Sequence, residues 1–145
     1  MNFDDLNQEI SNLKYQYHKL LFLCNDNLLH NKILKENKEI QVVNVNLLLS
    51  ELLLTISKKQ YSLFVDEFLR KVFIDKEKIY VLDRINVLFD TSLQTNPVRL
   101  MENISKQHQL VVVWPGKYEN GELIYAEQSH PEYFTCSNFE GKVIS

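Results

Sequence analysis

Glycine is scarce in this chain, and the first one stands at position 116 of 145. A phosphate-binding P-loop needs glycines, because they let consecutive backbone N–H groups turn toward the anion. The segment after the first apolar run, where such a loop would stand, reads Asn25-Asp26-Asn27-Leu28-Leu29-His30-Asn31-Lys32. Its branched leucines would obstruct the approach of a pyrophosphate. The sequence therefore argues against tight nucleotide binding at this place.

Cysteine and long apolar runs are also lacking. Cys24 and Cys136 are too few for a disulfide framework or a metal cluster, and they are typical of a reducing cytosol, so we expect a cytoplasmic location. No apolar run approaches the roughly 20 residues that span a bilayer. Acidic residues stand near the start, where a secretion signal would be basic and then apolar. We therefore expect no membrane partner.

An excess of positive charge is missing as well. The formal net charge is −3, from 16 basic and 19 acidic residues that are interspersed along the chain. Such a chain has no global field that would recruit nucleic acid, so we expect nucleic acid to be contacted only indirectly. A nucleic-acid accessory role would need a local basic patch, for which the candidates are Lys58, Lys59, Arg70, Lys71 and Lys106.

Apolar runs suited to a buried sheet are what the chain does contain. Hydrophobic residues make up 45% of the sequence, enough for the core of one domain that spans residues 1–145. Short apolar or β-branched runs predict strands at 19–24, 39–45, 78–83 and 109–114. The run at 109–114 ends sharply at Pro115-Gly116.

Helical patterns alternate with these runs. The spacing of Phe3, Leu6, Ile10, Leu13 and Tyr17 predicts an amphipathic N-terminal helix over 1–17. Further helices are predicted over 28–37 after Asp26 or Asn27, over 47–73 as two helices with a break near 57–62, and over 97–107. Asn44 or Asn46 is expected to cap the helix that begins at residue 47. Asn96 stands before Pro97 at the start of the helix predicted over 97–107. The alternation predicts a three-layer α/β domain with a mostly parallel central sheet.

The C-terminal part, 117–145, has a different character. Asn120-Gly121 stands between two short apolar segments and predicts a hairpin or edge strand. The histidines are scattered without metal-ligand spacing. Ser129-His130-Pro131-Glu132 has no nucleophile paired with it in the sequence, so we assign no catalytic residue.

One acidic strand end invites a functional interpretation. Residues 79–83 place Asp83 after four apolar residues, the form of a Walker B strand, whose carboxylate holds Mg²⁺ beside the phosphates of ATP. Arg84 follows, where many such ATPases place a glutamate. Lys32 is the nearest candidate for the P-loop lysine, but Ile33 replaces the magnesium-binding hydroxyl. An acid that merely ends a buried strand remains the simpler interpretation.

Several segments together resemble one known family. They are 81–90, Leu93, 96–100, 110–116, 123–127 and 130–133, and include an aspartate-led strand, Phe89-Asp90, Trp114-Pro115-Gly116 and a tyrosine-rich tail. In this order they resemble BrxF, the small P-loop-type protein of bacterial BREX phage-defence systems. The resemblance covers roughly residues 79–134 well and the first half only in outline.

The resemblance implies a P-loop NTPase-like fold and a place beside larger defence proteins, among them a methyltransferase, a phosphatase-like component and a large ATPase. Only Asp83 matches a functional residue of the family, the Walker B acid. The Walker A glycines, lysine and hydroxyl have no secure counterparts, so the Walker A loop is degenerate. We therefore expect a non-catalytic pseudo-NTPase subunit of an antiviral complex that acts by protein–protein association and has no cofactor.

Two alternatives stay open. The contact with other defence proteins, or with a second copy in a homo-oligomer, would use apolar and aromatic side chains, but the same residues can merely complete the core. The candidates for this contact are Phe64, Phe68, Trp114, Tyr125 and Tyr133. The rival hypothesis is a weak ATPase completed by a partner or second subunit, with Lys32 near the phosphates of ATP and Asp83 on Mg²⁺.

Overall fold

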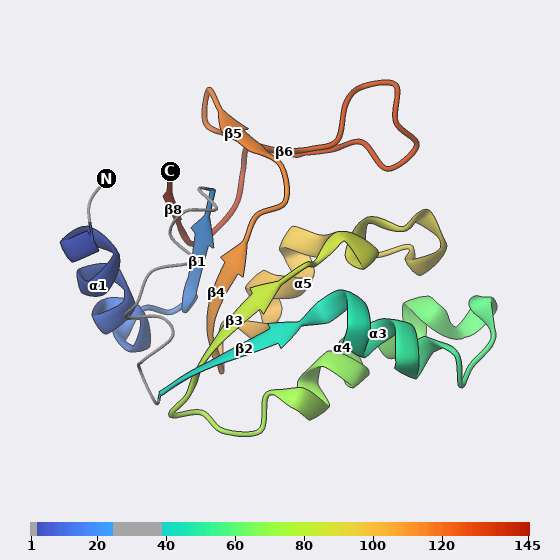
Figure 1. Ribbon diagram of the computed structural model, residues 1–145, viewed down its shortest axis with the longest axis horizontal. Helices are drawn as coiled ribbons and strands as arrows, with labels where there is room; N and C mark the ends of the chain where they lie inside the picture. Colours follow the sequence, from blue (N-terminus) through green and yellow to red (C-terminus); the bar gives the residue numbers. More distant parts are fainter. Residues whose placement is uncertain (1–2, 25–38) are drawn as a thin grey trace.

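A five-stranded parallel sheet forms the centre of the computed structural model, which describes residues 3–24 and 39–145. The strand order is β2-β3-β4-β1-β8, and every pair of neighbours is parallel (Figure 1). The strands are β1 (Leu20–Leu23), β2 (Ile40–Asn44), β3 (Ile79–Asp83), β4 (Gln109–Val113) and β8 (Lys142–Ile144). The first four confirm the predicted runs, whereas β8 was not predicted.

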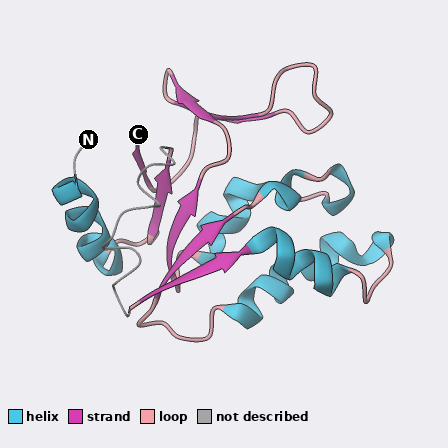
Figure 2. Cartoon of the chain, viewed as in Figure 1, coloured by secondary structure: helices cyan, strands magenta, loops and turns pink. Residues whose placement is uncertain are grey.

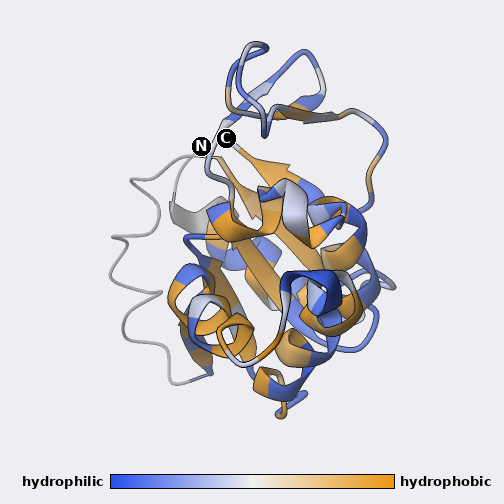
Figure 3. Ribbon diagram, turned by 90° about the vertical axis from the view of Figure 1, so that its right-hand side faces the viewer, coloured by the Kyte–Doolittle hydropathy of each residue, from blue (hydrophilic) through white to orange (hydrophobic). Residues whose placement is uncertain are grey.

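Alternate side chains of the strands point to opposite faces of the sheet, where they enter two separate apolar clusters. Phe22, Leu82 and Val112 join the cluster on one face, and their neighbours Leu23 and Val81 join the cluster on the other. The predicted three layers follow, because helices cover both faces (Figures 1 and 2). Figure 3 shows the apolar strands at the centre and, around them, helices that carry both apolar and hydrophilic residues.

One face is covered by α1 (Phe3–Asn12) and the 3₁₀ turn η1 (Leu13–Tyr15). Leu6, Ile10 and Leu13 are buried there, which confirms the predicted amphipathic helix. Tyr17 was assigned to the same apolar stripe, and this assignment is wrong. Its side chain is 72% exposed, because the helical turns end at residue 15 and the chain then extends toward β1.

The other face is covered by α3 (Val45–Leu53), α4 (Tyr61–Val72) and α5 (Pro97–Ile104). Asn44 caps α3, since its side-chain oxygen accepts a hydrogen bond from the Leu47 amide at 3.1 Å. The predicted break between α3 and α4 is confirmed and contains the 3₁₀ turn η3 (Lys58–Gln60). Asn96 caps α5, which ends three residues earlier than predicted. The helix predicted over 28–37, with its caps Asp26 or Asn27, lies outside the described residues.

A second, antiparallel sheet stands above the carboxyl ends of β1 and β4 (Figure 1). It consists of β5 (Lys117–Glu119), β6 (Glu122–Tyr125) and β7 (Phe134–Cys136). The predicted hairpin is confirmed: Asn120 and Gly121 have φ angles of 53° and 78°, as a tight turn between antiparallel strands requires. The chain then returns to the main sheet as β8.

Candidate functional site

The carboxyl edge of the main sheet is where a parallel α/β domain binds its ligands. Such sites lie where the connections from two neighbouring strands lead in opposite directions. Here the chain leaves β1 toward β2 at one end of the sheet, and leaves β4 toward β8 at the other end. Leu23 and Val113 lie side by side at the ends of these strands. The carboxyl ends of β1 and β4 are therefore the candidate site.

At the carboxyl end of β4 the second sheet packs directly against the strand end. The indole of Trp114 is buried, and its Nε1 donates a hydrogen bond to the Ile124 carbonyl in β6 at 3.0 Å. At Gly116, a Cβ atom would lie only 1.9 Å from the same carbonyl oxygen. Glycine is required at this position because the backbone of β6 runs directly against it.

Four aromatic rings fill the space beneath the second sheet, and we call them the aromatic roof: Phe89, Trp114, Tyr125 and Phe134. The Phe89 and Tyr125 rings are stacked with centroids 3.8 Å apart and planes within 10°. Trp114 meets Phe89 edge to face at 5.5 Å. The hydroxyl of Tyr125 accepts a hydrogen bond from Asn86 at 3.2 Å. The roof is therefore fixed by both packing and a polar contact.

Asp83 and Asn44 lie side by side at the carboxyl ends of β3 and β2, and both are half-buried. One carboxylate oxygen of Asp83 accepts a hydrogen bond from the Arg84 amide at 2.9 Å. Arg84 has a φ of 53° and its carbonyl accepts from the Asn46 amide at 2.9 Å. Asn46, the alternative cap for α3, instead accepts from the Val87 amide at 2.7 Å. Asp83 thus shapes the turn after β3.

The chemical capacity of this edge is limited in the described part. No group of three or more His, Cys, Asp or Glu that could hold a metal occurs within residues 3–24 and 39–145. Cys24 follows β1, and burial raises the pKa of its thiol to about 11, so it carries little thiolate at neutral pH. Lys32 and the segment 25–32 lie outside the described residues, so the degenerate Walker A loop stays a prediction.

The residues predicted to bind a partner occupy different environments. Trp114 is 2% exposed, and Tyr125 lies in the aromatic roof. Phe64 and Phe68 on α4 are half-buried, with ring centroids 5.9 Å apart. Tyr133 is 38% exposed. A buried indole belongs to the core, so of these residues Tyr133 is the most accessible to another molecule.

Three more exposed apolar side chains, on or next to α3 and α4, were not identified from the sequence. Leu47, Leu54 and Leu63 are between 58% and 85% exposed. Leu47 and Leu54 are seven residues apart and so lie on one helical face, together with Ser50 and Glu51. This polar pair was the signal that could have marked the face as exposed.

The candidate basic patch is partly neutralised by neighbouring acids. On α4, Arg70 binds Asp66 at 2.6 Å and Lys71 contacts Glu67 at 3.5 Å. Lys58 and Lys59 are exposed in η3, and Lys106 follows α5. Two of the five candidate cations are therefore paired with carboxylates, which weakens the attraction of this surface for a phosphate backbone.

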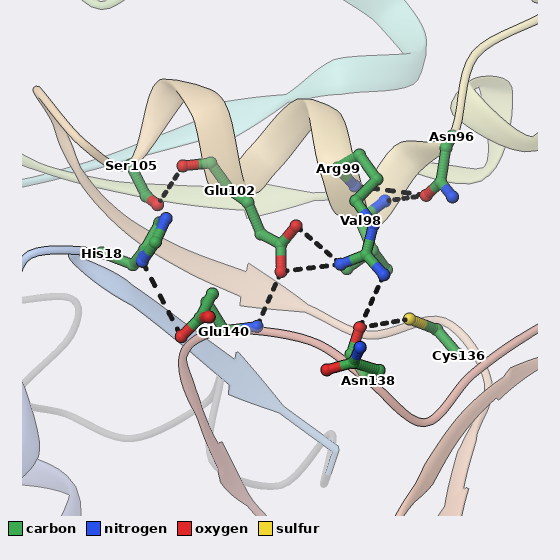
Figure 4. A network of polar contacts seen from close by, with 9 residues as sticks. All are labelled: His18, Asn96, Val98, Arg99, Glu102, Ser105, Cys136, Asn138 and Glu140. Carbon is green, nitrogen blue, oxygen red and sulfur yellow. Dashed lines mark hydrogen bonds and ion pairs between the residues drawn. The ribbon is translucent and has the colours of Figure 1, made fainter.

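A polar cluster joins α5 to the segment before the last strand, and we call it the Glu102 clasp (Figure 4). Glu102 is 7% exposed, and its carboxylate accepts from Arg99 Nη1 at 2.8 and 3.0 Å. It also accepts from the Glu140 amide at 2.6 Å. Arg99 Nη2 donates to the Asn138 carbonyl at 2.7 Å. The clasp thereby anchors the segment that leads into β8.

Comparison with known proteins finds no matching family model, no matching curated protein and no matching solved structure. In the part of the chain that the structure describes, no helix is both long and apolar enough to cross a membrane. A functional proposal for this chain therefore rests on its own residues and geometry.

Proposed function

We propose that this chain is a partner-binding domain with a P-loop NTPase-like fold and a degenerate nucleotide site. In this proposal it serves as a non-catalytic subunit of a bacterial anti-phage complex of the BREX type. The parallel sheet with helices on both faces is compatible with that fold. The place in a defence complex depends on the sequence resemblance over residues 79–134.

The aromatic roof is the observation that carries the proposal. A nucleotide at the carboxyl edge needs room beside the strand ends and backbone amides that face its phosphates. At the end of β4, that room is taken by β6, whose Ile124 carbonyl accepts the Trp114 hydrogen bond and lies against Gly116. A carbonyl oxygen presents a partial negative charge, which repels phosphate. This edge is therefore better suited to a structural role than to nucleotide turnover.

The helix pair α3–α4 offers the surface for association. Leu47, Leu54 and Leu63 expose large apolar side chains there. Covering such side chains with another protein removes apolar surface from water and so stabilises the complex. A test would combine the purified chain with purified candidate partners from the same defence locus and follow co-elution by size-exclusion chromatography. We expect Leu54→Glu with Leu63→Glu to abolish co-elution.

The matched control for that test is Ile74→Glu, because Ile74 is 83% exposed but lies beyond the end of α4. This variant should co-elute like the unmodified chain. Equal loss in both variants would show that added charge, rather than a specific surface, prevents assembly. Full co-elution of the Leu54→Glu, Leu63→Glu variant would contradict the proposed surface.

A nucleotide titration tests the degenerate site. A fluorescent ATP analogue, added with and without Mg²⁺, should show no saturable binding in the micromolar range, either to the chain or to Asp83→Ala. Asp83→Ala should also keep the fold by circular dichroism, because within residues 3–24 and 39–145 its carboxylate accepts a hydrogen bond only from the neighbouring Arg84 amide. Saturable, Mg²⁺-dependent binding that Asp83→Ala abolishes would refute the proposal.

Such binding would favour the alternative, a weak ATPase whose site is completed by a partner or second subunit. One observation supports this alternative: Asp83 is half-buried at the same sheet edge as the end of β1, with only β4 between β3 and β1. In that case Asp83 would hold Mg²⁺ and Lys32 would approach the phosphates. Adding the partner should then raise ATP turnover, and Asp83→Ala should remove the increase.

A further inference from the structure

A groove of about 310 Å³ lies between the connection that follows β3 and the segment that precedes β7. Two carboxylates, Asp90 and Glu132, line it together with the rings of Phe89, Tyr133 and Phe134. We propose that this acidic-aromatic groove binds a single basic side chain, lysine or arginine, of a partner protein. The inference rests on the proposed function, because it names the chemistry of the partner that the domain binds.

The two carboxylates come from separate segments, and local contacts hold each segment in place. One oxygen of Asp90 accepts hydrogen bonds from the Ser92 amide at 2.9 Å and the Ser92 hydroxyl at 2.7 Å. These bonds lower the pKa of Asp90, so it is ionised at neutral pH. The Glu132 amide donates to His130 Nδ1 at 3.0 Å. Two carboxylates on opposite walls can accept hydrogen bonds from one cation.

The aromatic lining suits the rest of a basic side chain. Tyr133 is 38% exposed, which leaves part of its ring accessible to a cation or to an aliphatic stem. Its amide donates to the His130 carbonyl at 3.1 Å, which fixes the backbone of this wall. Phe89 and Phe134 belong to the aromatic roof and are held 5.6 Å apart. The groove is therefore formed before a partner arrives, which reduces the entropic cost of binding.

The charges around the groove favour a cation and disfavour an anion. No Lys, Arg or His is among its lining residues in the described part of the chain. The positive charge of Lys58 in η3 helps to lower the pKa of Asp90, but Lys58 does not line the groove. The first turn of α5 is also adjacent, and its Val98 and Arg99 amides are already bound by Asn96 at 3.1 and 3.2 Å. The helix end therefore offers no free donors to an anion there.

The size of the groove limits the occupant. Its volume of about 310 Å³ is at the lower end of the range for small-molecule sites, roughly 300–1,000 Å³. A whole helix would not enter, whereas one long side chain would. Charge complementarity then selects lysine or arginine over leucine or glutamate.

An NMR titration tests this site directly. The ¹⁵N-labelled chain is titrated at low salt with three capped peptides, Ac-Gly-Arg-Gly-NH₂, Ac-Gly-Lys-Gly-NH₂ and Ac-Gly-Leu-Gly-NH₂. We expect saturable shifts of the amides of residues 90–95 and 132–134 with the basic peptides, weakened by added salt, and none with the leucine peptide. Asp90→Asn with Glu132→Gln should weaken binding about two- to fivefold per carboxylate lost, the factor typical of exposed ion pairs.

The matched control is Asp66→Asn with Glu67→Gln, which removes the same charge from α4. Its affinity for the basic peptides should equal that of the unmodified chain. Lys58→Gln should bind at least as tightly as the unmodified chain, because a competing cation is gone. The dispersed spectrum of each variant shows at the same time that it is folded.

Three results would overturn the groove proposal: no saturable shifts with either basic peptide, equal shifts with the leucine peptide, or equal weakening in the α4 control. None of them would affect the nucleotide titration or the co-elution test. Conversely, tight ATP binding would refute the proposed function while the peptide titration could still succeed. The two proposals therefore fail by separate measurements.

Discussion

His108 is a buried histidine without a partner for one of its ring nitrogens. It is 7% exposed, and its Nδ1 finds no hydrogen-bond partner within the described part of the chain. Its ring faces Phe73 and Tyr80, with centroids 6.0 and 6.5 Å away. Burial, and then the positive charges of Lys76 and Arg70, lower its pKa below the ordinary value of about 6.5. The folded state therefore favours the neutral form of the His108 ring.

This residue makes stability depend on pH. Because the unfolded chain binds the proton more tightly, the contribution of neutral His108 is complete above pH 6.5 and is lost as pH falls through the lowered pKa. Urea unfolding at pH 7.5, 6.5 and 5.5 should show a decreasing free energy of unfolding. His108→Leu should reduce this decrease. An unaltered pH dependence in His108→Leu would assign the effect to other groups.

Gly116 and Gly121 are glycines for two different reasons, close packing at Gly116 and a left-handed backbone conformation at Gly121. At Gly116 an added Cβ would meet the Ile124 carbonyl oxygen at 1.9 Å, whereas at Gly121 it would meet nothing within 4 Å but would require a φ of 78°. Gly116→Ala should therefore lower the free energy of unfolding by roughly 2–4 kcal/mol and loosen the aromatic roof. Gly121→Ala should cost only about 1–2 kcal/mol, the strain of the left-handed conformation.

Urea unfolding measures both costs, and the near-ultraviolet circular dichroism of Trp114 reports the roof. The signal should weaken in Gly116→Ala and persist in Gly121→Ala. Equal costs and equal spectra in the two variants would mean that the second sheet moves away from β4 at little expense.

At the scale of elements, β8 depends on side chains that lie elsewhere in the sequence. Its three residues, Lys142–Ile144, pair with β1 and form an edge of the sheet. The Glu102 clasp binds the residues just before it, through the Glu140 amide and the Asn138 carbonyl. Gly141, with a φ of 93°, passes close to the Leu20 carbonyl. The strand forms because these contacts place it.

Removing the clasp should therefore loosen β8 first. Glu102→Ala leaves Arg99 and the Glu140 amide without their acceptor, which should cost about 2–3 kcal/mol of the free energy of unfolding. Hydrogen exchange by NMR should be accelerated most at the amides of Val143 and Ile144. Glu67→Gln, which breaks an exposed ion pair with Lys71 at 3.5 Å, should change stability by less than about 1 kcal/mol. Uniform acceleration over all strands would show that the clasp supports the whole sheet instead.

The same elements show what the sequence can predict. The runs at β1 and β4 are apolar on both faces, and Asn96-Pro97 marks the start of α5, so local patterns predict these elements. Three residues are too few to show a period, so β8 has no local signal. The burial of Trp114 depends likewise on Ile124, ten residues away, and on an edge-to-face contact with the Phe22 ring, which no spacing in the sequence reveals. Both the formation of β8 and the burial of Trp114 therefore depend on tertiary contacts, which local sequence patterns do not reveal.

For the whole molecule, residues 138–145 complete the central sheet. They contribute β8, the Phe139 ring that packs on Phe22 at 5.5 Å, and the Glu140 amide in the clasp. A chain that ends at residue 137 would leave one edge of β1 unpaired and apolar, and such edges pair with other chains. We expect this truncated chain to aggregate, as measured by light scattering after size-exclusion chromatography.

The control for that truncation shortens the exposed segment 127–131 to two glycines. It removes surface residues outside both sheets and should elute as sharply as the full chain. A monodisperse truncated chain with native circular dichroism would show that the sheet is stable with four strands.

The position of β1 between β4 and β8 also bears on how quickly the native state is reached. Leu21 pairs with Lys142, so two segments 142 − 21 = 121 residues apart must meet before this part of the sheet exists. Closing such large loops is entropically costly, and chains dominated by distant contacts fold slowly. During synthesis, β1 is made well before β8 and cannot pair with it until β8 has been made. In that interval its apolar edge is a natural substrate for a chaperone.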